Sequence, residues 1–451
     1  MLKGAAYING AFVESEKKLT IIGALKQKPV GSVPQLNAQQ INAAFKAAQS
    51  AQGPWSLTKW QTRASFLKKL TQELKNNVNK LAKMMEQEIA KPLAQGQQEV
   101  LRSIEYINLT IATYQKVMRK KITAAGKTAT IYRVPLGVVL AISPFNYPVN
   151  LSLSKIVPAL LAGNSVVFKP ATNGSLVGYL LATLFDALKL PPGVFNFLTG
   201  SGSQIGDLLT KHPAVSMISF TGGIKVGQRI AKLRPLVPIV LELGGNDAAY
   251  VRSDADLKKA AQSIAKGAFG YAGQRCTAIK RLILHADIKD AFLPLLIKEA
   301  RHLPTLPLVN TAAADWVSKM LQEPVNKILL GGKRRGNQFE NTIVQTSPSS
   351  LSWQEEAFGP LLPVVVCDSD EKALKLINDT HYGLQNSLYT SDYKWARSVA
   401  NQIESGTVNI NGASSRGPDQ FPFLGIKDSG VGVQGVEDAL LSMSRYLNVV
   451  E

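Results

Sequence analysis

The sequence predicts an α/β fold built on parallel, doubly wound sheets. Short apolar segments alternate with helical patterns between residues 138 and 242, beginning "GVVLAISPFNYPVNLSLSKIVPALLAGNSVVFKP". The chain has 451 residues, too many for one compact core, and its 45% hydrophobic content is ordinary for a globular protein. A second alternation of strands and helices begins near residue 247. We therefore expect two α/β domains.

The N-terminal region precedes the first parallel strand. "YINGAFV" (7–13) predicts a tight β-hairpin, because Asn9-Gly10 stands between apolar residues. Apolar residues recur at spacings of three and four from about 62 to 89, which predicts one long amphipathic helix. A second helix is expected over about 97–117.

The alternating region supplies the turns where a ligand is expected. Strands at 138–143 and 166–169 flank a helix that closes at Gly163-Asn164, and further strands follow in "GVFNFLTG", "SMISFTG" and "PIVLELGG". Ligands of parallel sheets bind beyond the carboxyl ends of the strands. The turns to inspect follow Ser143, Lys169, Thr221 and Leu241.

The C-terminal half predicts a second α/β domain, with strands in "RLILH", "LPVVVCD", "NSLYT" and "GTVNING". Two remote segments with strand character lack a core of their own: "KKITAAGKTATIYRVP", before the first parallel strand, and the tail "SRYLNVVE". Such segments favour a β-ribbon that joins subunits of an oligomer.

Composition narrows the function classes. Lys and Arg number 51 against 32 Asp and Glu, a net charge of +19, which favours anionic ligands such as phosphorylated metabolites. No nucleic-acid-binding motif is present, and no apolar stretch is long enough to cross a bilayer, so neither nucleic acid nor membrane is an expected partner. The chain has two cysteines, without a CxxC pair or a signal-peptide pattern, which favours a cytoplasmic protein. No metal site is expected.

Cys276 lies in the polar, glycine-rich segment "FGYAGQRCTAIKR", whereas Cys367 is flanked by aliphatic residues. Gly270 and Gly273 free the backbone before Cys276, and Arg275 adds positive charge beside it. A cysteine nucleophile needs access, thiolate character and oxyanion stabilisation. The pattern is compatible either with a reactive cysteine or with an exposed loop thiol.

Two polar residues at strand ends are candidate companions. Glu242, in "LELGGN", ends a predicted buried strand, where a carboxylate requires a partner or a task. It is either catalytic or the cap of the following turn. Asn146, between Pro144 and Pro148, is either a rigid oxyanion donor or a helix N-cap.

These motifs resemble those of the aldehyde dehydrogenase superfamily. The match runs in order through "PFNYP", "AGNSVVFKP", "ISFTG", "LELGG", "GQRCT", "EEAFGP" and "GTVNIN". The resemblance implies a Rossmann-type cofactor domain (1–118 and 138–246), an α/β catalytic domain (247–424) and a β-ribbon oligomerisation element (119–137 and 425–451), usually in dimers or tetramers. It implies Cys276 as nucleophile and Glu242 as the base that activates water. Asn146 and the Cys276 backbone N–H would form the oxyanion hole.

The resemblance further implies a nicotinamide cofactor. Lys169 would contact the adenosine ribose, and Thr172 stands where NAD-preferring members often carry Glu. Because the missing carboxylate removes repulsion against a 2′-phosphate, we expect NADP, with NAD as the alternative. Glu356 would bind the other ribose and Phe358 would pack near the nicotinamide. Ser143, Pro144, Gly222, Gly223 and Leu243 complete the expected cofactor contacts.

Two positions depart from the family pattern. Gly223 replaces a serine that usually touches the pyrophosphate, although a helix N-terminus still attracts an anion and Lys225 is a candidate for compensation. Asn246 stands where lysine is common.

Within the superfamily, the sequence is similar to the branch of non-phosphorylating, NADP-dependent glyceraldehyde-3-phosphate dehydrogenases, above all in "SSRGPDQFPFLGIKDSGVGVQG". The implied reaction oxidises glyceraldehyde 3-phosphate to 3-phosphoglycerate, as in glycolysis, through a cysteine thioester that water hydrolyses. The implied contacts to a small phosphorylated aldehyde are Arg102, Tyr147, Arg275, Thr277 and Arg416. Arginine suits phosphate because its planar fork gives bidentate bonds, but Arg102 alone is also compatible with a surface ion pair.

Other functions stay open at this stage. The chain is shorter than its relatives in the ribbon and after "ARHLPTLPLVN", and it carries a large positive charge. The alternatives are a dehydrogenase of another small aldehyde or semialdehyde and an inactive basic scaffold. A coenzyme A-acylating enzyme is disfavoured, because such relatives generally lack the base that Glu242 supplies.

Overall fold

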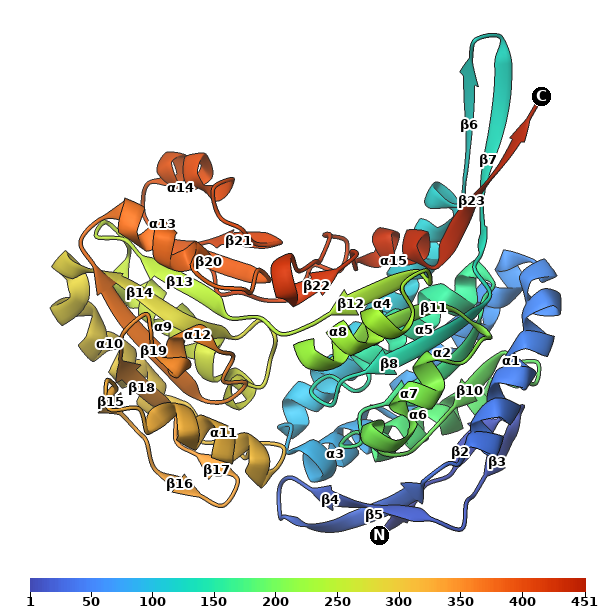
Figure 1. Ribbon diagram of the computed structural model, residues 1–451, viewed down its shortest axis with the longest axis horizontal. Coiled ribbons are helices and arrows are strands. Elements are labelled where there is room, and N and C mark those ends of the chain that lie inside the picture. The colour runs from blue at the N-terminus through green and yellow to red at the C-terminus, as the bar shows by residue number, and fades with distance from the viewer. The chain divides into compact units, whose positions relative to one another are not determined.

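The computed structural model describes residues 1–451, which form two compact units (Figure 1). Unit 1 contains Met1–Leu241, Pro418–Pro422 and Gly432–Glu451, and unit 2 contains Glu242–Gly417 and Phe423–Val431. Both have parallel sheets with helices, so the predicted α/β fold is confirmed. The functional roles assigned to the predicted domains stay predictions.

The N-terminal part of unit 1 begins with short strands and continues as helices. Its elements are β1 (Leu2–Lys3), β2 (Ala6–Ile8), β3 (Ala11–Val13), β4 (Lys18–Gly23), β5 (Lys28–Pro34), α1 (Ala38–Leu57), α2 (Trp60–Asn76), α3 (Val78–Ile89) and α4 (Leu93–Val117). The predicted hairpin is confirmed, since β2 and β3 pair antiparallel across Asn9 and Gly10, which both have positive φ.

The prediction of one continuous helix over 62–89 is wrong. The structure has two helices there, α2 and α3, which meet at Asn77. The Asn77 side chain donates to the backbone carbonyl of Glu73 at 2.9 Å and so competes with the helical hydrogen-bond ladder. Hydrophobic spacing did not reveal this break, because the apolar face continues across it. The next predicted helix is confirmed as α4.

The rest of unit 1 alternates strands and helices as predicted. The elements are β8 (Val138–Ser143), α5 (Asn150–Ala162), β9 (Ser165–Pro170), α6 (Ser175–Ala187), β10 (Phe195–Phe197), α7 (Gly202–Thr210), β11 (Val215–Thr221), α8 (Ile224–Leu233), β12 (Ile239–Glu242), whose last residue begins unit 2, and α15 (Val436–Ser442). The strand order is β12-β11-β8-β9-β10-β2-β3, and β8 pairs parallel with both β9 and β11. The carboxyl ends of these three strands therefore share one edge, as the ligand prediction requires.

Helix α5 shows how sequence places the turns of this sheet. Every residue of the helix is buried, and it ends at Gly163, whose φ of 97° is a left-handed conformation that glycine adopts without strain. Asn164 then directs the chain into β9: its side-chain oxygen accepts from the N–H groups of Leu136 and Gly137.

Unit 2 contains a second parallel sheet in the order β15-β18-β19-β14-β13-β20-β21, of which only β15 runs antiparallel to its neighbour. Its strands are β13 (Asp247–Val251), β14 (Ile279–His285), β15 (Lys327–Leu330), β18 (Thr342–Gln345), β19 (Leu361–Cys367), β20 (Gln385–Tyr389) and β21 (Thr407–Ile410), with short β16 (Arg334–Arg335), β17 (Gln338–Phe339) and β22 (Gly430–Val431) elsewhere. Its helices are α9 (Leu257–Phe269), α10 (Lys289–His302), α11 (Thr311–Leu321), α12 (Leu351–Gln354), α13 (Asp370–Asn378) and α14 (Tyr393–Ala400).

Helices cover both faces of this second sheet. Along β13, Ala249 and Val251 pack in a core with residues of α9 and α10, whereas Ala248 and Tyr250 pack with residues of α13 and α14. This alternation is the consequence of successive strand side chains pointing to opposite faces. The sheet is rigid for that reason and holds the loops at its edges in fixed positions.

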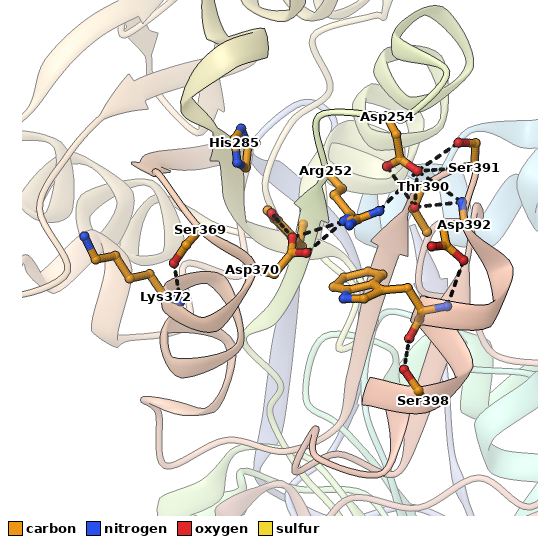
Figure 2. Close-up of polar contacts among 12 residues, drawn as sticks. Arg252, Asp254, His285, Ser369, Asp370, Lys372, Thr390, Ser391, Asp392 and Ser398 are labelled. Atoms are coloured by element: carbon orange, nitrogen blue, oxygen red, sulfur yellow. Dashed lines mark hydrogen bonds and ion pairs between the residues drawn. The ribbon is translucent and has the colours of Figure 1, made fainter.

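A polar network closes the carboxyl edge of this sheet, beyond β13 and β20 (Figure 2). Arg252 bridges Asp370 at 2.9 Å and Asp254 at 3.3 Å, and Asp254 also accepts hydrogen bonds from Thr390 and Ser391. The network joins the loop after β13 to the starts of α13 and α14. These contacts are all satisfied within the network, which indicates a structural role.

The predicted ribbon forms a separate sheet of unit 1, in the order β23-β7-β6 (Figure 1). Strands β6 (Arg119–Ala124) and β7 (Lys127–Pro135) pair antiparallel, and the tail adds β23 (Ser444–Val450), with Ser444 opposite Pro135. The predicted third strand is thus confirmed. None of the helices combines the length and apolar character that a membrane span requires.

Candidate active site

The Cys276 loop follows a strained turn. Tyr271, Ala272 and Gly273 all have positive φ, of 53°, 52° and 68°, which non-glycine residues seldom adopt in succession. At Gly273 a Cβ would lie 2.3 Å from the carbonyl oxygen of Gly359, so only glycine fits. The side chain of Gln274, fully buried, accepts from the N–H of Val309 at 2.8 Å. The backbone before Cys276 is therefore fixed.

Four charged side chains of unit 2 act on the thiol of Cys276. Burial raises its pKa to about 11, Lys280 and Arg416 oppose that rise, and Glu356 and Glu242 add to it. The structure thus brings the predicted nucleophile, base, cofactor carboxylate and one substrate arginine into one electrostatic environment. The positive charge that the sequence predicted from Arg275 stays a prediction. The Arg275 side chain turns back to donate to the carbonyls of Gly270 and Gly267.

Lys280 is the functional candidate that sequence reasoning missed. Its side chain is 3% exposed, and its Nζ lies 2.7 Å from the Cys276 carbonyl oxygen and 3.1 Å from Glu356 Oε1. It lies in β14, next to Arg281, which is also buried and donates to the carbonyls of Asn246, Leu376 and Ile377. The sequence feature that could have revealed Lys280 is the pair of adjacent basic residues in a strand whose other residues are mostly apolar.

The Gly244-Gly245 turn lies against the same group of side chains. Gly245 N–H donates to Glu356 Oε1 at 3.2 Å, and a Cβ on Gly244 would lie 2.4 Å from Glu356 Oε2. A Cβ on Gly245 would lie 2.8 Å from the Cys276 carbonyl oxygen. The glycines after Glu242 therefore allow the segment that follows this residue to approach both Cys276 and Glu356.

Glu242 is 2% exposed at the end of β12. The N–H of the next residue, Leu243, donates to the carbonyl of Ser429 at 2.9 Å, so a predicted cofactor contact at Leu243 cannot use that N–H. Of the other predicted residues of this unit, Thr277 is buried and Phe358 has a φ of 43°.

In unit 1, the loop after β8 carries Asn146, which is 3% exposed. The N-cap alternative for this residue is wrong: α5 begins at Asn150, its N-cap position is Val149, and no side chain caps it. Ser143 at the end of β8 accepts a hydrogen bond from Ser152 at 2.8 Å, which ties the strand end to α5. The predicted oxyanion role of the Asn146 amide stays a prediction.

A buried ion pair holds this loop. Lys91 and Glu99, each with a side chain 1% exposed, pair at 2.6 Å. Lys91 also donates to the Asn146 carbonyl at 2.9 Å and lies 3.4 Å from the centre of the Tyr147 ring. Glu99 accepts from the N–H groups of Val149 and Asn150, which begin α5. The loop is therefore preorganised by side chains from outside the sheet, which no local sequence signal revealed.

Lys169 at the end of β9 fits a cofactor with anionic groups. It is 4% exposed, donates to its neighbour's carbonyl at Pro170, and has no carboxylate partner, and desolvation lowers its pKa to about 8. A buried ammonium without a counter-ion is costly, and a ligand bearing oxygen acceptors or negative charge would compensate it.

Helix α6, just after Thr172, has its N-terminus already satisfied. The buried carboxylate of Glu88 accepts from the N–H groups of Gly174, Leu176 and Val177 at 2.8 to 3.0 Å. A cofactor phosphate near Thr172 would therefore meet the Thr172 hydroxyl and Lys169 rather than this helix end.

Helix α8 begins after the two glycines of "FTGG". A Cβ on Gly223 would meet nothing within 4 Å, so the missing serine leaves open space at the helix N-terminus, and Lys225 lies exposed in the first turn. Thr221, at the end of β11, accepts from the buried Lys155 at 2.6 Å. Sequence reasoning missed Lys155 because it lies within an otherwise apolar helix.

The arginines predicted for phosphate binding differ in their contacts. Arg102 forms a bidentate pair with Asp419, at 2.8 and 3.2 Å, so the ion-pair alternative holds for this residue in the structure. Arg275 is held by its own loop, as described above. Arg416 lies with its guanidinium carbon 4.6 Å from the centre of the Phe423 ring and acts on Cys276.

Comparison with known proteins identifies the family. The model of the aldehyde dehydrogenase family matches residues 12–449. The NADP-dependent glyceraldehyde-3-phosphate dehydrogenase of Streptococcus equinus is 39% identical, with 98% of each chain covered, and that of Pisum sativum is 36% identical, with 98% of this chain and 94% of the relative covered. The crystal structure of the enzyme of that name from Bacillus halodurans C-125, complexed with NADP, superimposes with a TM-score of 0.98 at 37% identity, covering 100% of this chain and 99% of the other. The expected family is therefore confirmed: this chain is a member of the aldehyde dehydrogenase family.

Proposed function

We propose that this protein oxidises glyceraldehyde 3-phosphate to 3-phosphoglycerate with NADP, through a thioester on Cys276 that water hydrolyses. The observation that carries the proposal is the grouping of Cys276 with Glu242, Glu356 and Arg416 in one electrostatic environment. It is supported by the full-length similarity to enzymes named for this substrate and cofactor.

The chemistry follows from the residues in place. The Cys276 thiolate adds to the aldehyde carbon, and the oxyanion accepts hydrogen bonds from Asn146 and the Cys276 N–H. A bound NADP would supply the acceptor for the hydride that leaves this carbon. Glu242 then removes a proton from the water that attacks the thioester, which releases the acid and regenerates the thiol. One aldehyde, one water and one NADP+ are consumed, and the products are one carboxylate, one NADPH and two protons.

NADP is favoured over NAD by the charges around β9. Thr172 supplies a hydroxyl where a carboxylate would repel a 2′-phosphate, and Lys169 is a buried cation without a counter-ion. Glu356 is the carboxylate proposed to bind the nicotinamide ribose.

The test is reduction of NADP by the purified protein with glyceraldehyde 3-phosphate, in the absence of added phosphate and of coenzyme A. We expect 3-phosphoglycerate as product, a lower rate with NAD, and loss of activity in Cys276→Ser, because a serine hydroxyl is a far weaker nucleophile without a dedicated base. Cys367→Ser is the matched control and should stay active. A requirement for phosphate or coenzyme A as acceptor would contradict the hydrolytic step.

A second candidate is oxidation of another small aldehyde or semialdehyde with NADP. It is favoured by the contacts of two arginines that were predicted to bind phosphate. Arg102 is paired with Asp419, and Arg275 donates to backbone carbonyls, so both guanidinium groups already have partners. A panel of aldehydes with and without a phosphate group separates the two candidates by kcat/KM.

We further propose that the β23-β7-β6 sheet joins copies of this chain into a dimer or tetramer. Its strands expose apolar side chains, among them Tyr446, Val449 and Val450. The expected compartment is the cytoplasm, with which the two free thiols agree.

A further inference from the structure

Lys280 has no role in the proposed reaction, although it lies beside two of the residues that the proposal uses. It is buried at the start of β14, and its ammonium contacts the backbone of the nucleophile on one side and the Glu356 carboxylate on the other. Cys276 and Glu356 are far apart in the sequence. The Lys280 side chain therefore links these two segments within unit 2.

We propose that Lys280 is a positioning residue, which fixes the Cys276 loop against Glu356 and supplies the positive charge that favours the Cys276 thiolate. The inference rests on the proposed function in one respect, namely that Cys276 is the nucleophile.

The geometry supports both parts of this role. An ammonium has three donors, and Lys280 directs them to the Cys276 carbonyl at 2.7 Å, the Ala278 carbonyl at 3.4 Å and Glu356 Oε1 at 3.1 Å. Two of these acceptors lie in the loop that carries the thiol. Movement of that loop would break its hydrogen bonds to a buried charge, which is expensive.

The charges around this group decide the sign of the effect. The thiol is faced by Lys280 and Arg416, which favour the thiolate, and by Glu356 and Glu242, which oppose it. Lys280 is itself faced by Glu356 and, from β13, by Asp247. Removing Lys280 leaves the buried carboxylates of Glu356 and Asp247 without their shared counter-ion, and of these Glu356 acts against a negative sulfur.

The experiment measures alkylation of Cys276 by iodoacetamide between pH 7 and pH 10, without substrate or cofactor, with the modified peptide quantified by mass spectrometry. Only the thiolate reacts, so the rate reports the thiolate fraction. We expect Lys280→Met to slow alkylation at pH 8 about tenfold and to displace the profile by about one pH unit to the alkaline side. Lys280→Arg, which keeps the charge, should be slowed less.

Glu356 gives a test of opposite sign. Glu356→Gln removes a negative charge near the thiol and should accelerate alkylation, and Lys280→Met/Glu356→Gln should lie between the two single variants. Lys327→Met is the matched control, because it removes the charge of an exposed lysine on β15 and should leave the profile unchanged.

Three results would overturn the proposal. The first is alkylation of Lys280→Met at the wild-type rate, and the second is equal slowing in Lys280→Met and Lys280→Arg, which would indicate packing alone. The third is no acceleration in Glu356→Gln, a measurement that stands even if Lys280→Met fails to fold. Because the assay contains no aldehyde or NADP, it keeps its meaning if the proposed substrate or cofactor is wrong.

Discussion

Arg416 differs from Arg102 and Arg275 in what holds its side chain. The guanidinium of Arg102 is already matched by the carboxylate of Asp419, and that of Arg275 by backbone carbonyls. Arg416 lies over an aromatic ring and close enough to Cys276 to act on its pKa. Of the three, it is the one that we expect to hold the phosphate of a short aldehyde whose other end meets the thiol.

Arg416→Leu should therefore raise KM for glyceraldehyde 3-phosphate about tenfold or more, while unphosphorylated glyceraldehyde changes much less. Loss of the charge also disfavours the thiolate, which would slow both substrates. Arg416→Lys separates these effects, because it keeps the charge but not the bidentate fork. Steady-state kinetics on both aldehydes check the prediction, and an equal loss on the two would contradict a phosphate role.

Among individual residues, the sequence predicted those that lie in recognisable motifs. It missed the residues that hold these motifs in place. Cys276 and Glu242 were singled out because glycines or a strand end mark them, and Glu356 was named through the family resemblance of its motif. Lys91, Glu99 and Lys280 were not, since each acts on a segment remote in sequence: Lys91 on the Asn146 carbonyl, Glu99 on the start of α5, and Lys280 on Glu356. Only the folded chain brings such partners together.

Elements were predicted well where their hydrophobic pattern is local. Strand β8 has the predicted bounds, and α5 ends at the predicted glycine. The break at Asn77 was missed, because a side chain that bonds to its own helix leaves no trace in apolar spacing. The polar network in Figure 2 was also missed, since its residues come from three separate segments.

Asp254 is the centre of that network and fixes the start of α14. It accepts from the Thr390 hydroxyl, from the hydroxyl and N–H of Ser391, and from the N–H of Asp392, at 2.8 to 3.2 Å. Asp392 in turn caps α14 by accepting from the N–H of Trp395. One carboxylate thus joins the loop after β13 to the helix that covers one face of the sheet.

Asp254→Asn should destabilise unit 2 by about 1 to 3 kcal/mol, because an amide replaces one acceptor oxygen with a donor that faces other donors. Desolvation raises the pKa of the Asp254 carboxyl, but the hydrogen bonds from Ser391 and Thr390 lower it. The net shift of this pKa is downward. A carboxyl with a lowered folded-state pKa stabilises the protein above its unfolded value of about 3.9, and this contribution is lost as the pH falls through the folded value.

The measurement is the melting temperature by calorimetry at pH 7 and pH 3. Asp254→Asn should melt below wild type at pH 7, with the difference shrinking at pH 3. Asp368→Asn is the matched control, since it removes an exposed pair with Lys372 that contributes little. Equal melting temperatures for wild type and Asp254→Asn at pH 7 would contradict the assignment.

At the scale of the whole molecule, the two edge strands of the ribbon differ in how much of the positive charge they carry. Strand β6, at one edge, is exposed throughout and carries Arg119, Lys120 and Lys121. Strand β23, at the other edge, exposes Tyr446, Leu447, Val449 and Val450, with Arg445 as its one charged residue. Charged edge strands resist pairing with another chain, whereas apolar ones favour it. The β23 edge is therefore the expected contact between copies.

We expect the wild-type protein to be larger than a single chain in solution and Leu447→Asp/Val449→Asp to shift it toward the monomer mass. The two substituted side chains point to the same face of β23, where they are 44% exposed, so the charges should disrupt association without unfolding the subunit. Light scattering coupled to size-exclusion chromatography gives the mass. Leu236→Asp is the control, because this side chain is 97% exposed outside the ribbon and should leave the mass unchanged. If the double variant keeps the wild-type mass, or if the wild type is already monomeric, the ribbon does not join copies of this chain. The exposed apolar side chains of β23 would then need another explanation.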